Sequence, residues 1–373
     1  MYPLPFRSLI SVIIIFLIAA PISAQTVTFS AVGDIFFGRG GRQFGTENPF
    51  RYVSGELKGR DIVLGNLESP ICESRARVLE EPCSLKKGTC DTPEKKRYRR
   101  LFFLTFQARI SAARMLRGAG FTVVSTANNH AEDQGGPGIL ETLEHLKQQN
   151  VSAVGSGPTK ADAWQPVIIE KNKIRVGIIA ATTILNFTPV EKSGFVAHGT
   201  LKRLRSILPQ RISELKEHVD FVVVTLHYGA EDSSHPSYRE QQLVADMVQA
   251  GMDVFIGTHP HVLQGVQVTE KAVIFWSLGN FLFDSRKDSW RESGIVHLDF
   301  HKDGAQKRIE NIRFVPVTLS GDPQRLPIIA NEWRAPKIID LIQDRSRRFR
   351  NPQTSFSVEN NQLHIRMGSD PAF

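Results

Sequence analysis

The sequence has few cysteines and lacks the short motifs of several large enzyme classes. Its three cysteines, Cys72, Cys83 and Cys90, share one charged segment and lack the paired spacing of a structural zinc site. One local disulfide can form there in an oxidising compartment, and the spacing leaves open which pair forms it. No Walker loop, Gly-x-Ser-x-Gly turn or His-Glu-x-x-His helix is present. P-loop, nucleophile-elbow and zincin chemistry are therefore excluded.

Long apolar runs are also absent, except at the N-terminus. Arg7 precedes the apolar residues 9–20, Pro21 interrupts them, and Ala24 ends a small-residue site typical of signal-peptidase cleavage. The run is shorter than the roughly 20 residues that a membrane-spanning helix needs. We therefore expect residues 1–24 to be a signal peptide and the mature protein to be soluble in the periplasm or cell envelope. An uncleaved N-terminal anchor is the alternative.

Positive charge is only mildly in excess, since the formal net charge is +8 over 373 residues. Basic residues cluster at 95–100 and 345–350, with few aromatic residues between them. This pattern disfavours nucleic acid as a partner. An anionic extracellular polymer or a phosphate-rich envelope suits the charge better.

The remaining sequence predicts an α/β fold, because short β-branched runs alternate with amphipathic helical stretches. Strands are expected at 27–32, 61–65, 122–125, 175–180, 221–225, 254–256, 273–276, 295–300 and 312–317. Helices are expected from Pro137, from Arg239 and after Pro336. We expect one domain over residues 25–320 with a cysteine-bearing surface insertion at 73–100. Residues 321–373 are expected to form a C-terminal helix and, from Asn351, a loose polar tail.

Polar residues able to bind metal follow five of the predicted strands. They are Asp34, Asn66 with Glu68, Asn128 with Asn129 and His130, His227, and His259 with His261. Each alone is typical of a turn, a helix cap or a structural histidine. Together they occupy the carboxyl ends of strands, where ligand sites gather in open α/β sheets.

This mixed oxygen and nitrogen set suits one or two divalent ions, either Mn²⁺, Fe or Zn²⁺. The two imidazoles of His259-Pro260-His261 are one residue apart and can reach two neighbouring ions. A two-metal site can bind a phosphate ester and activate water. Glu68 can bridge such a pair, and His130 can donate a proton.

Six ordered segments resemble the bacterial CapA family of capsule (poly-γ-glutamate) biosynthesis over roughly residues 28–284. They read AVGDIFFGR, LGNLESPI, STANNHAEDQG, LHYGAED, GTHPHVLQG and SLGNFLFD. The family is related to calcineurin-like metallophosphoesterases. The resemblance implies a four-layer α/β sandwich of two mixed β-sheets flanked by helices, with a dinuclear metal site at the strand ends.

Carried over to this sequence, the resemblance implies one role for each motif residue. It implies the metal ligands Asp34, Glu68, Asn129, His227, His259 and His261, the catalytic His130, and substrate contacts by Asn66, Asn128 and Asn280. Two departures stand out. Phe36 occupies the position of an expected histidine ligand, and Glu68 replaces a shorter aspartate. One metal position therefore has a ligand fewer.

The resemblance implies a part in exopolymer synthesis and leaves the reaction open. We expect a metal-dependent hydrolase of phosphoesterase type, acting on a phosphoester or an anionic exopolymer. The alternative is a non-catalytic accessory protein that binds the polymer or the membrane-bound capsule synthase complex. Nucleic-acid processing has the least support.

Overall fold

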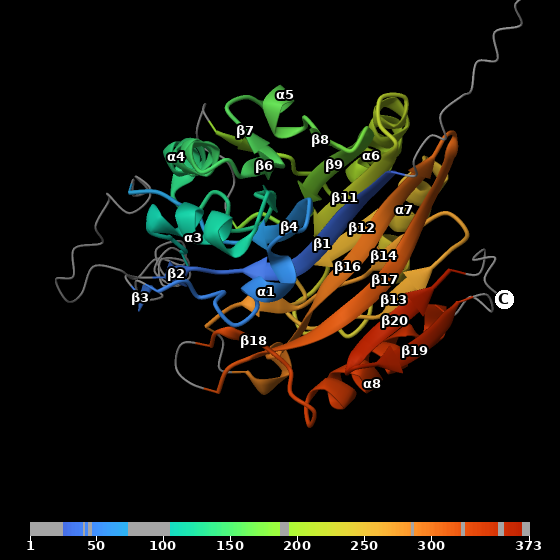
Figure 1. Ribbon diagram of the computed structural model, residues 1–373. Coiled ribbons are helices and arrows are strands. Elements are labelled where there is room, and N and C mark those ends of the chain that lie inside the picture. The colour runs from blue at the N-terminus through green and yellow to red at the C-terminus, as the bar shows by residue number, and fades with distance from the viewer. Residues whose placement is uncertain are drawn as a thin grey trace, which may run out of the picture.

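Two mixed β-sheets pack face to face between outer layers of helices (Figure 1). The computed structural model describes residues 25–39, 42–43, 47–73, 105–186, 194–284, 287–321, 325–349 and 354–367. The predicted leader and nearly all of the predicted insertion, with Cys83 and Cys90, lie outside these residues. No helix in the described part is long and apolar enough to cross a membrane.

The first sheet contains the N-terminal strand at its centre. Its order is β19 (Ser355–Glu359), β20 (Gln362–Arg366), β17 (Gln306–Leu319), β16 (Glu292–Asp303), β1 (Gln25–Ile35), β4 (Ile62–Leu67), β5 (Val123–Ser125) and β6 (Ser152–Val154). Strands β1, β4, β5 and β6 are parallel, and the other four pair antiparallel. The short strands β15 (Asn280–Leu282) and β18 (Pro327–Ile329) pair with β1 and β17.

The second sheet has a parallel centre and antiparallel edges. Its order is β13 (Val266–Val268), β14 (Val273–Phe275), β12 (Val254–Thr258), β11 (Phe221–His227), β9 (Ile174–Thr182) and β8 (Val167–Lys171). The central strands β14, β12, β11 and β9 are parallel, whereas β13 and β8 pair antiparallel.

Three buried clusters hold the layers together. Between the sheets, Val27 and Phe29 of β1 share a cluster with Val176 of β9 and Val223 of β11. The outer face of the first sheet is covered by α1 (Ser54–Leu57), α3 (Ser111–Ala119) and α4 (Gly135–Gln148). The second sheet is covered by α6 (Leu201–Lys216) and α7 (Tyr238–Gln249). The expected four-layer α/β sandwich is therefore confirmed.

Most predicted elements are present, and several strands run further than their β-branched cores. Strand β1 continues to Ile35 and β11 to His227, so both include a polar residue of the predicted site. Helix α7 buries Leu243 and Met247 on one face, as its spacing predicts, and Gly251 follows with the left-handed φ of 107°. Helix α8 (Ala335–Ser346) carries Pro336 in its first turn.

The expectation of a loose tail from Asn351 was wrong for residues 354–367. They form the β19–β20 hairpin, and β20 pairs with β17 at the edge of the first sheet. Leu363 and Ile365 alternate with polar residues, which is the period of a strand with one buried face. Both are buried in the cluster between the sheets. The polar composition of the tail hides this short alternation.

Replacing Leu363 with alanine is expected to lower the free energy of unfolding by about 2–5 kcal/mol, because the side chain is fully buried. Val358→Ala is the matched control, since Val358 lies on the same hairpin and is 53% exposed. It should cost at most about 0.5 kcal/mol. Denaturant unfolding measures both. Equal costs for the two variants would show that the hairpin does not belong to the folded core.

Cys72 precedes the predicted insertion and is buried. Burial raises the pKa of its thiol to about 12. A thiol of this kind is not a nucleophile at neutral pH, which agrees with the absence of cysteine chemistry in the motif pattern.

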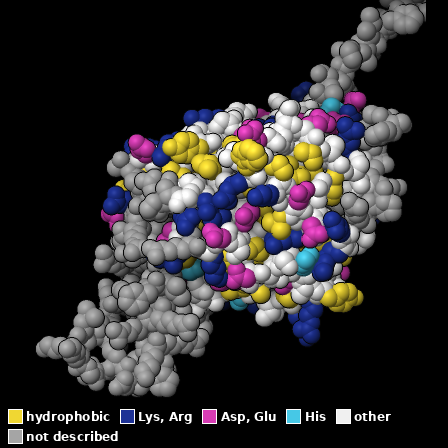
Figure 2. Space-filling view, turned by 90° about the horizontal axis from the view of Figure 1, so that it is seen from below, with side chains coloured by type: hydrophobic (Ala, Val, Ile, Leu, Met, Phe, Trp, Pro, Cys, Tyr) yellow, Lys and Arg dark blue, Asp and Glu magenta, His cyan; other side chains and the backbone are white. Residues whose placement is uncertain are grey.

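Basic side chains do not gather in one field on the face shown in Figure 2, where Lys and Arg are interspersed with acidic residues. Of the two predicted basic clusters, 95–100 lies outside the described residues. In the other, Arg345 donates a hydrogen bond to the carbonyl of Leu263, and Arg347 lies 3.3 Å from Asp344. These two arginines therefore have partners within the fold.

Candidate metal centre

The five predicted strand ends meet at one edge of the sandwich. Asp34 lies at the end of β1, and Glu68 directly follows β4. From the other sheet, His227 ends β11 and His259 directly follows β12. Since the parallel strands of both sheets carry their carboxyl ends to this edge, residues far apart in sequence become neighbours.

Asp34, Glu68 and His261 form the tightest cluster of ligand-type side chains in the described part of the chain. One ligand atom from each lies within 4.8 Å of the others. His261 Nδ1 is 3.5 Å from Asp34 Oδ2, and His261 Nε2 is 3.9 Å from Glu68 Oε1. All three residues are buried. Two ligands of one ion lie at most about 4.4 Å apart when each bond is near 2.2 Å. With one ligand atom taken from each residue, the 4.8 Å limit of this cluster is close to that span.

A second group of ligand-type side chains converges on the same oxygen of Glu68. His227 Nε2 lies 2.8 Å from Asn129 Oδ1 and 3.0 Å from His259 Nδ1. The same nitrogen is 3.9 Å from Glu68 Oε1. Both ligand sets therefore approach Glu68, and its role as a bridging carboxylate stays a prediction.

Glu68 provides the test of whether a cation fits. Its side chain is fully buried, and neither carboxylate oxygen has a hydrogen-bond partner among the described residues. Burial and the neighbouring Asp34 carboxylate raise its pKa well above the usual range. An unpartnered buried carboxylate is costly, and a metal ion is a standard way to satisfy it. The residues present therefore fit a divalent cation.

The histidines are suited to act as ligands. Burial, followed by the charge of His259, lowers the pKa of His227 well below its ordinary value. Burial and the nearby His261 lower the pKa of His259 to about 4. Both imidazoles are therefore neutral at physiological pH, which is the form that binds metal.

Three asparagines hold the ligand side chains in place. Asn66 Nδ2 donates to Asp34 Oδ1 at 2.8 Å, and Asn128 Nδ2 donates to Asn66 Oδ1 at 3.1 Å. Asn280 Oδ1 accepts from His261 Nδ1 at 2.8 Å. All three are almost completely buried. Their contacts are of the kind that orient metal ligands, and the substrate role expected for them stays a prediction.

The chain is similar in sequence to a family of bacterial capsule synthesis proteins. The profile of the bacterial capsule synthesis protein PGA_cap matches residues 28–285, in agreement with the expected range of 28–284. The chain belongs to this family. It is 34% identical over 290 residues to the PGA biosynthesis protein CapA of Bacillus subtilis (strain 168), covering 76% of this chain and 70% of that protein. It is 33% identical over 292 residues to the capsule biosynthesis protein CapA of Bacillus anthracis, covering 75% and 65%.

A more distant similarity links this PGA_cap chain to a solved structure. A putative 5'-nucleotidase from Staphylococcus aureus aligns with a TM-score of 0.49 and 15% identity, covering 86% of this chain and 58% of that one. A similarity this low says nothing about the reaction.

Two site residues of this PGA_cap member were missed by the sequence reasoning. Asp133 Oδ2 lies 2.6 Å from His130 Nδ1, and the ring of Phe106 stacks on the His130 imidazole at 3.6 Å and 7°. Asp133 stands inside the STANNHAEDQG motif, so its spacing from His130 was a usable signal. Phe106 follows the predicted insertion, and no sequence pattern connects it with His130.

The backbone around the two terminal histidines is unusual. His259 and His261 have φ values of 95° and 59°, in the left-handed region that non-glycine residues seldom adopt. This conformation turns both imidazoles toward the centre on either side of Pro260. At Gly33, a Cβ atom would lie 1.9 Å from the carbonyl oxygen of Gly279. Only glycine therefore allows the loop that carries Asn280 to approach β1 this closely.

Phe36, which replaces an expected histidine ligand, belongs to an aromatic wall beside the centre. Its ring centroid lies 4.5 Å from that of Phe106 and 5.0 Å from that of Phe283. Phe283 in turn packs 4.8 Å from the ring of His261. The wall packs against His261 of the ligand set, and Phe36 offers no ligand atom to it.

Proposed function

We propose that this chain is an exported, metal-dependent hydrolase of the cell envelope that acts in capsular exopolymer synthesis. Its substrate is a phosphoester or a linkage within an anionic polymer. The observation that carries the reaction is Glu68, whose carboxylate has no hydrogen-bond partner and is approached by two sets of ligands. The printed names of the CapA relatives support the pathway. Export rests on the apolar leader at residues 1–24.

The two ligand sets support two metal positions. One ion would be held by Asp34, Glu68 and His261, and a second by Glu68, Asn129, His227 and His259. The first position has fewer protein ligands, because Phe36 supplies none. Bound Mn²⁺, Fe or Zn²⁺ supplies Lewis-acid polarisation of the substrate oxygen and lowers the pKa of a bound water.

His130 is the group placed to move a proton. Its Nδ1 is held by the Asp133 carboxylate, so its Nε2 is directed inward, 3.9 Å from Glu68 Oε1. Stacking on Phe106 fixes the plane of the imidazole. Nε2 is therefore the atom that would transfer a proton to the leaving group.

Asp133→Asn is expected to lower kcat of metal-dependent hydrolysis about 10–100-fold, because an amide no longer fixes the His130 tautomer. Metal content should be unchanged, since Asp133 is in neither ligand set. The pH–rate profile should shift as well, which loss of packing alone would not produce. Asp340→Asn, an exposed change on α8, is the matched control. An unaltered kcat would contradict the positioning role.

The proposed function is tested by metal analysis and hydrolysis on the same sample. The chain is freed of metal by chelation, incubated with Mn²⁺ and desalted, and its metal content is measured. Hydrolysis of p-nitrophenyl phosphate and bis(p-nitrophenyl) phosphate is then followed with and without Mn²⁺. We expect at least one ion per chain and Mn²⁺-dependent turnover. Substoichiometric metal without turnover would overturn the hydrolase.

A non-catalytic accessory role is the second candidate, and Phe36 favours it. An aromatic wall in place of a ligand weakens one metal position, and a binding protein does not need two filled positions. Complementation of a deletion strain separates the two roles. Restored polymer production by the His261→Ala chain would favour the accessory protein, whereas failure of that stably folded variant favours the enzyme.

A further inference from the structure

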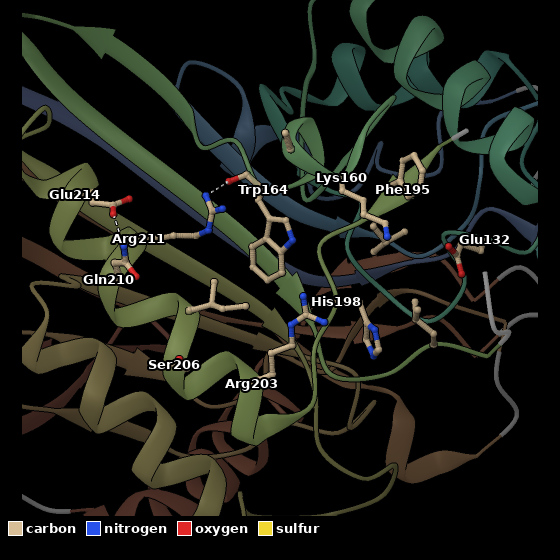
Figure 3. Close-up of a pocket in the computed structure, with 14 residues that line it drawn as sticks. Glu132, Lys160, Trp164, Phe195, His198, Arg203, Ser206, Gln210, Arg211 and Glu214 are labelled. Carbon is tan, nitrogen blue, oxygen red and sulfur yellow. Dashed lines mark hydrogen bonds between the residues drawn. The ribbon is translucent and has the colours of Figure 1, made fainter. Parts of the chain in front are cut away.

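A large cleft of about 880 Å³ lies apart from the ligand sets, between the segment of α5 (Lys160–Ala163) and helix α6 (Figure 3). Lys160 and Trp164 line it from the α5 side, and Arg203 and Arg211 line it from α6. Phe195 of β10 (Phe195–Val196) completes the wall near Lys160. The metal-centre residues named above do not line this cleft, so it is a separate feature of the surface.

One end of the cleft adjoins the metal centre through two short connections. Glu132 lines the cleft and stands two residues after His130. Leu185 lines it as well and directly precedes Asn186. The Asn186 amide lies 3.1 Å from the Asn129 side chain and 3.4 Å from His130 Nδ1. A chain lying in the cleft would therefore be led toward the centre.

The middle of the cleft is basic. Lys160 and Arg203 are exposed, and neither forms an ion pair with any described residue. His198 lies beside Arg203, whose charge, after burial, contributes to lowering the pKa of that imidazole. Lys160 lies 5.9 Å from the centroid of the Phe195 ring, which leaves its charge unneutralised, and cations without an acidic partner along a groove attract an anionic ligand.

The other polar groups leave this basic zone uncompensated. Arg211 is held in place, because it donates to the Trp164 carbonyl at 3.2 Å and lies 5.3 Å from the indole centroid. The acidic residues Glu214 and Glu132 lie at opposite ends of the view in Figure 3. Glu214 accepts a hydrogen bond from Gln210. The charges therefore alternate along the cleft as acid, base and acid.

We propose that this cleft binds an extended anionic segment of the substrate, one that carries carboxylate or phosphate groups in series, and directs it to the metal centre. The reaction at the far end rests on the proposed function, whereas the binding step does not. A volume of about 880 Å³, cations without an acidic partner and an aromatic lining suit a linear polymer better than a small compact anion.

Binding is measured with the full-length chain by fluorescence anisotropy. The probes are a fluorescent poly-γ-glutamate oligomer, a fluorescent polyphosphate and, as the neutral control, a fluorescent dextran. The test variant combines Lys160→Glu with Arg203→Glu. Lys202→Glu is the matched control, because Lys202 is exposed on the same helix and does not line the cleft. Thermal melting verifies that each variant folds.

We expect the double variant to weaken binding of the anionic probe at least about tenfold, and Lys202→Glu less than about twofold. Added salt should weaken wild-type binding. Preference for one anionic probe identifies the group that the cleft recognises. If neither anionic probe binds, or if wild type and the double variant bind equally well, the proposal that the cleft binds an anionic polymer would be overturned. If the double variant binds the probe more weakly but neither wild type nor any variant hydrolyses a substrate, the proposed hydrolase activity would be wrong. The cleft would still be an anion-binding site.

Discussion

His261→Ala is expected to lower Mn²⁺-dependent hydrolysis at least about 100-fold, beyond the effect usual for residues that only support a ligand. His261 is buried, and its two ring nitrogens face Asp34 and Glu68 at 3.5 and 3.9 Å. No other described side chain of that cluster can supply the lost imidazole ligand. Phe36, which stands where a further histidine ligand is expected, has no ligand atom. We also expect the variant to hold less metal after desalting.

His218→Ala is the matched control, since it deletes the same side chain at an exposed position between α6 and β11. Turnover and metal content are measured for both variants at several Mn²⁺ concentrations. Rescue of His261→Ala by excess Mn²⁺ would indicate weakened affinity rather than a lost step. Full activity and full metal content in His261→Ala would remove this residue from the ligand set.

Glu68→Gln is expected to have opposite effects on the metal-free and the metal-bound protein. Without metal, Glu68 is buried with two unpartnered oxygens near the Asp34 carboxylate. The neutral amide removes that repulsion, so we expect the metal-free variant to be more stable than metal-free wild type by about 1–3 kcal/mol. With Mn²⁺ at a thousandfold excess over Kd, wild type gains about 4.1 kcal/mol. The variant should gain much less and lose hydrolysis.

The order of melting temperatures is therefore expected to reverse when Mn²⁺ is added. Glu217→Gln, an exposed change on the chain, should leave both melting temperatures unaltered. Differential scanning calorimetry at fixed protein concentration measures all three proteins with chelator and with Mn²⁺. A metal-free variant that melts below metal-free wild type would show that Glu68 stabilises the fold without a cation.

The two predictions together separate the metal centre from the reaction. Metal binding without turnover in wild type would retain the centre and favour the accessory role. Turnover that persists in both His261→Ala and Glu68→Gln would show that the reaction takes place outside this metal centre. Because both ligands are buried, each variant needs the exposed control to distinguish loss of function from loss of fold.

Much of the fold follows from local patterns in the sequence. The buried runs that form β11 and β12 are β-branched and short, and α7 buries residues at helical spacing. Helix α6 carries the same signal in Leu204, Leu208 and Ile212, although Pro209 inside the helix disguises it. The β19–β20 hairpin was missed because its alternation is brief and lies in a polar stretch.

The ligand types and their place after strands are readable from the sequence, because carboxylate, amide and imidazole groups follow recognisable β-branched runs. Which of these groups meet depends on how the chain packs in three dimensions. Packing of the two sheets brings Asp34 and Glu68 from one sheet against His227 and His259 from the other. It also stacks Phe106 on His130 and leaves the Glu68 carboxylate without a hydrogen-bond partner. These outcomes depend on contacts between distant segments, which local periodicity does not encode.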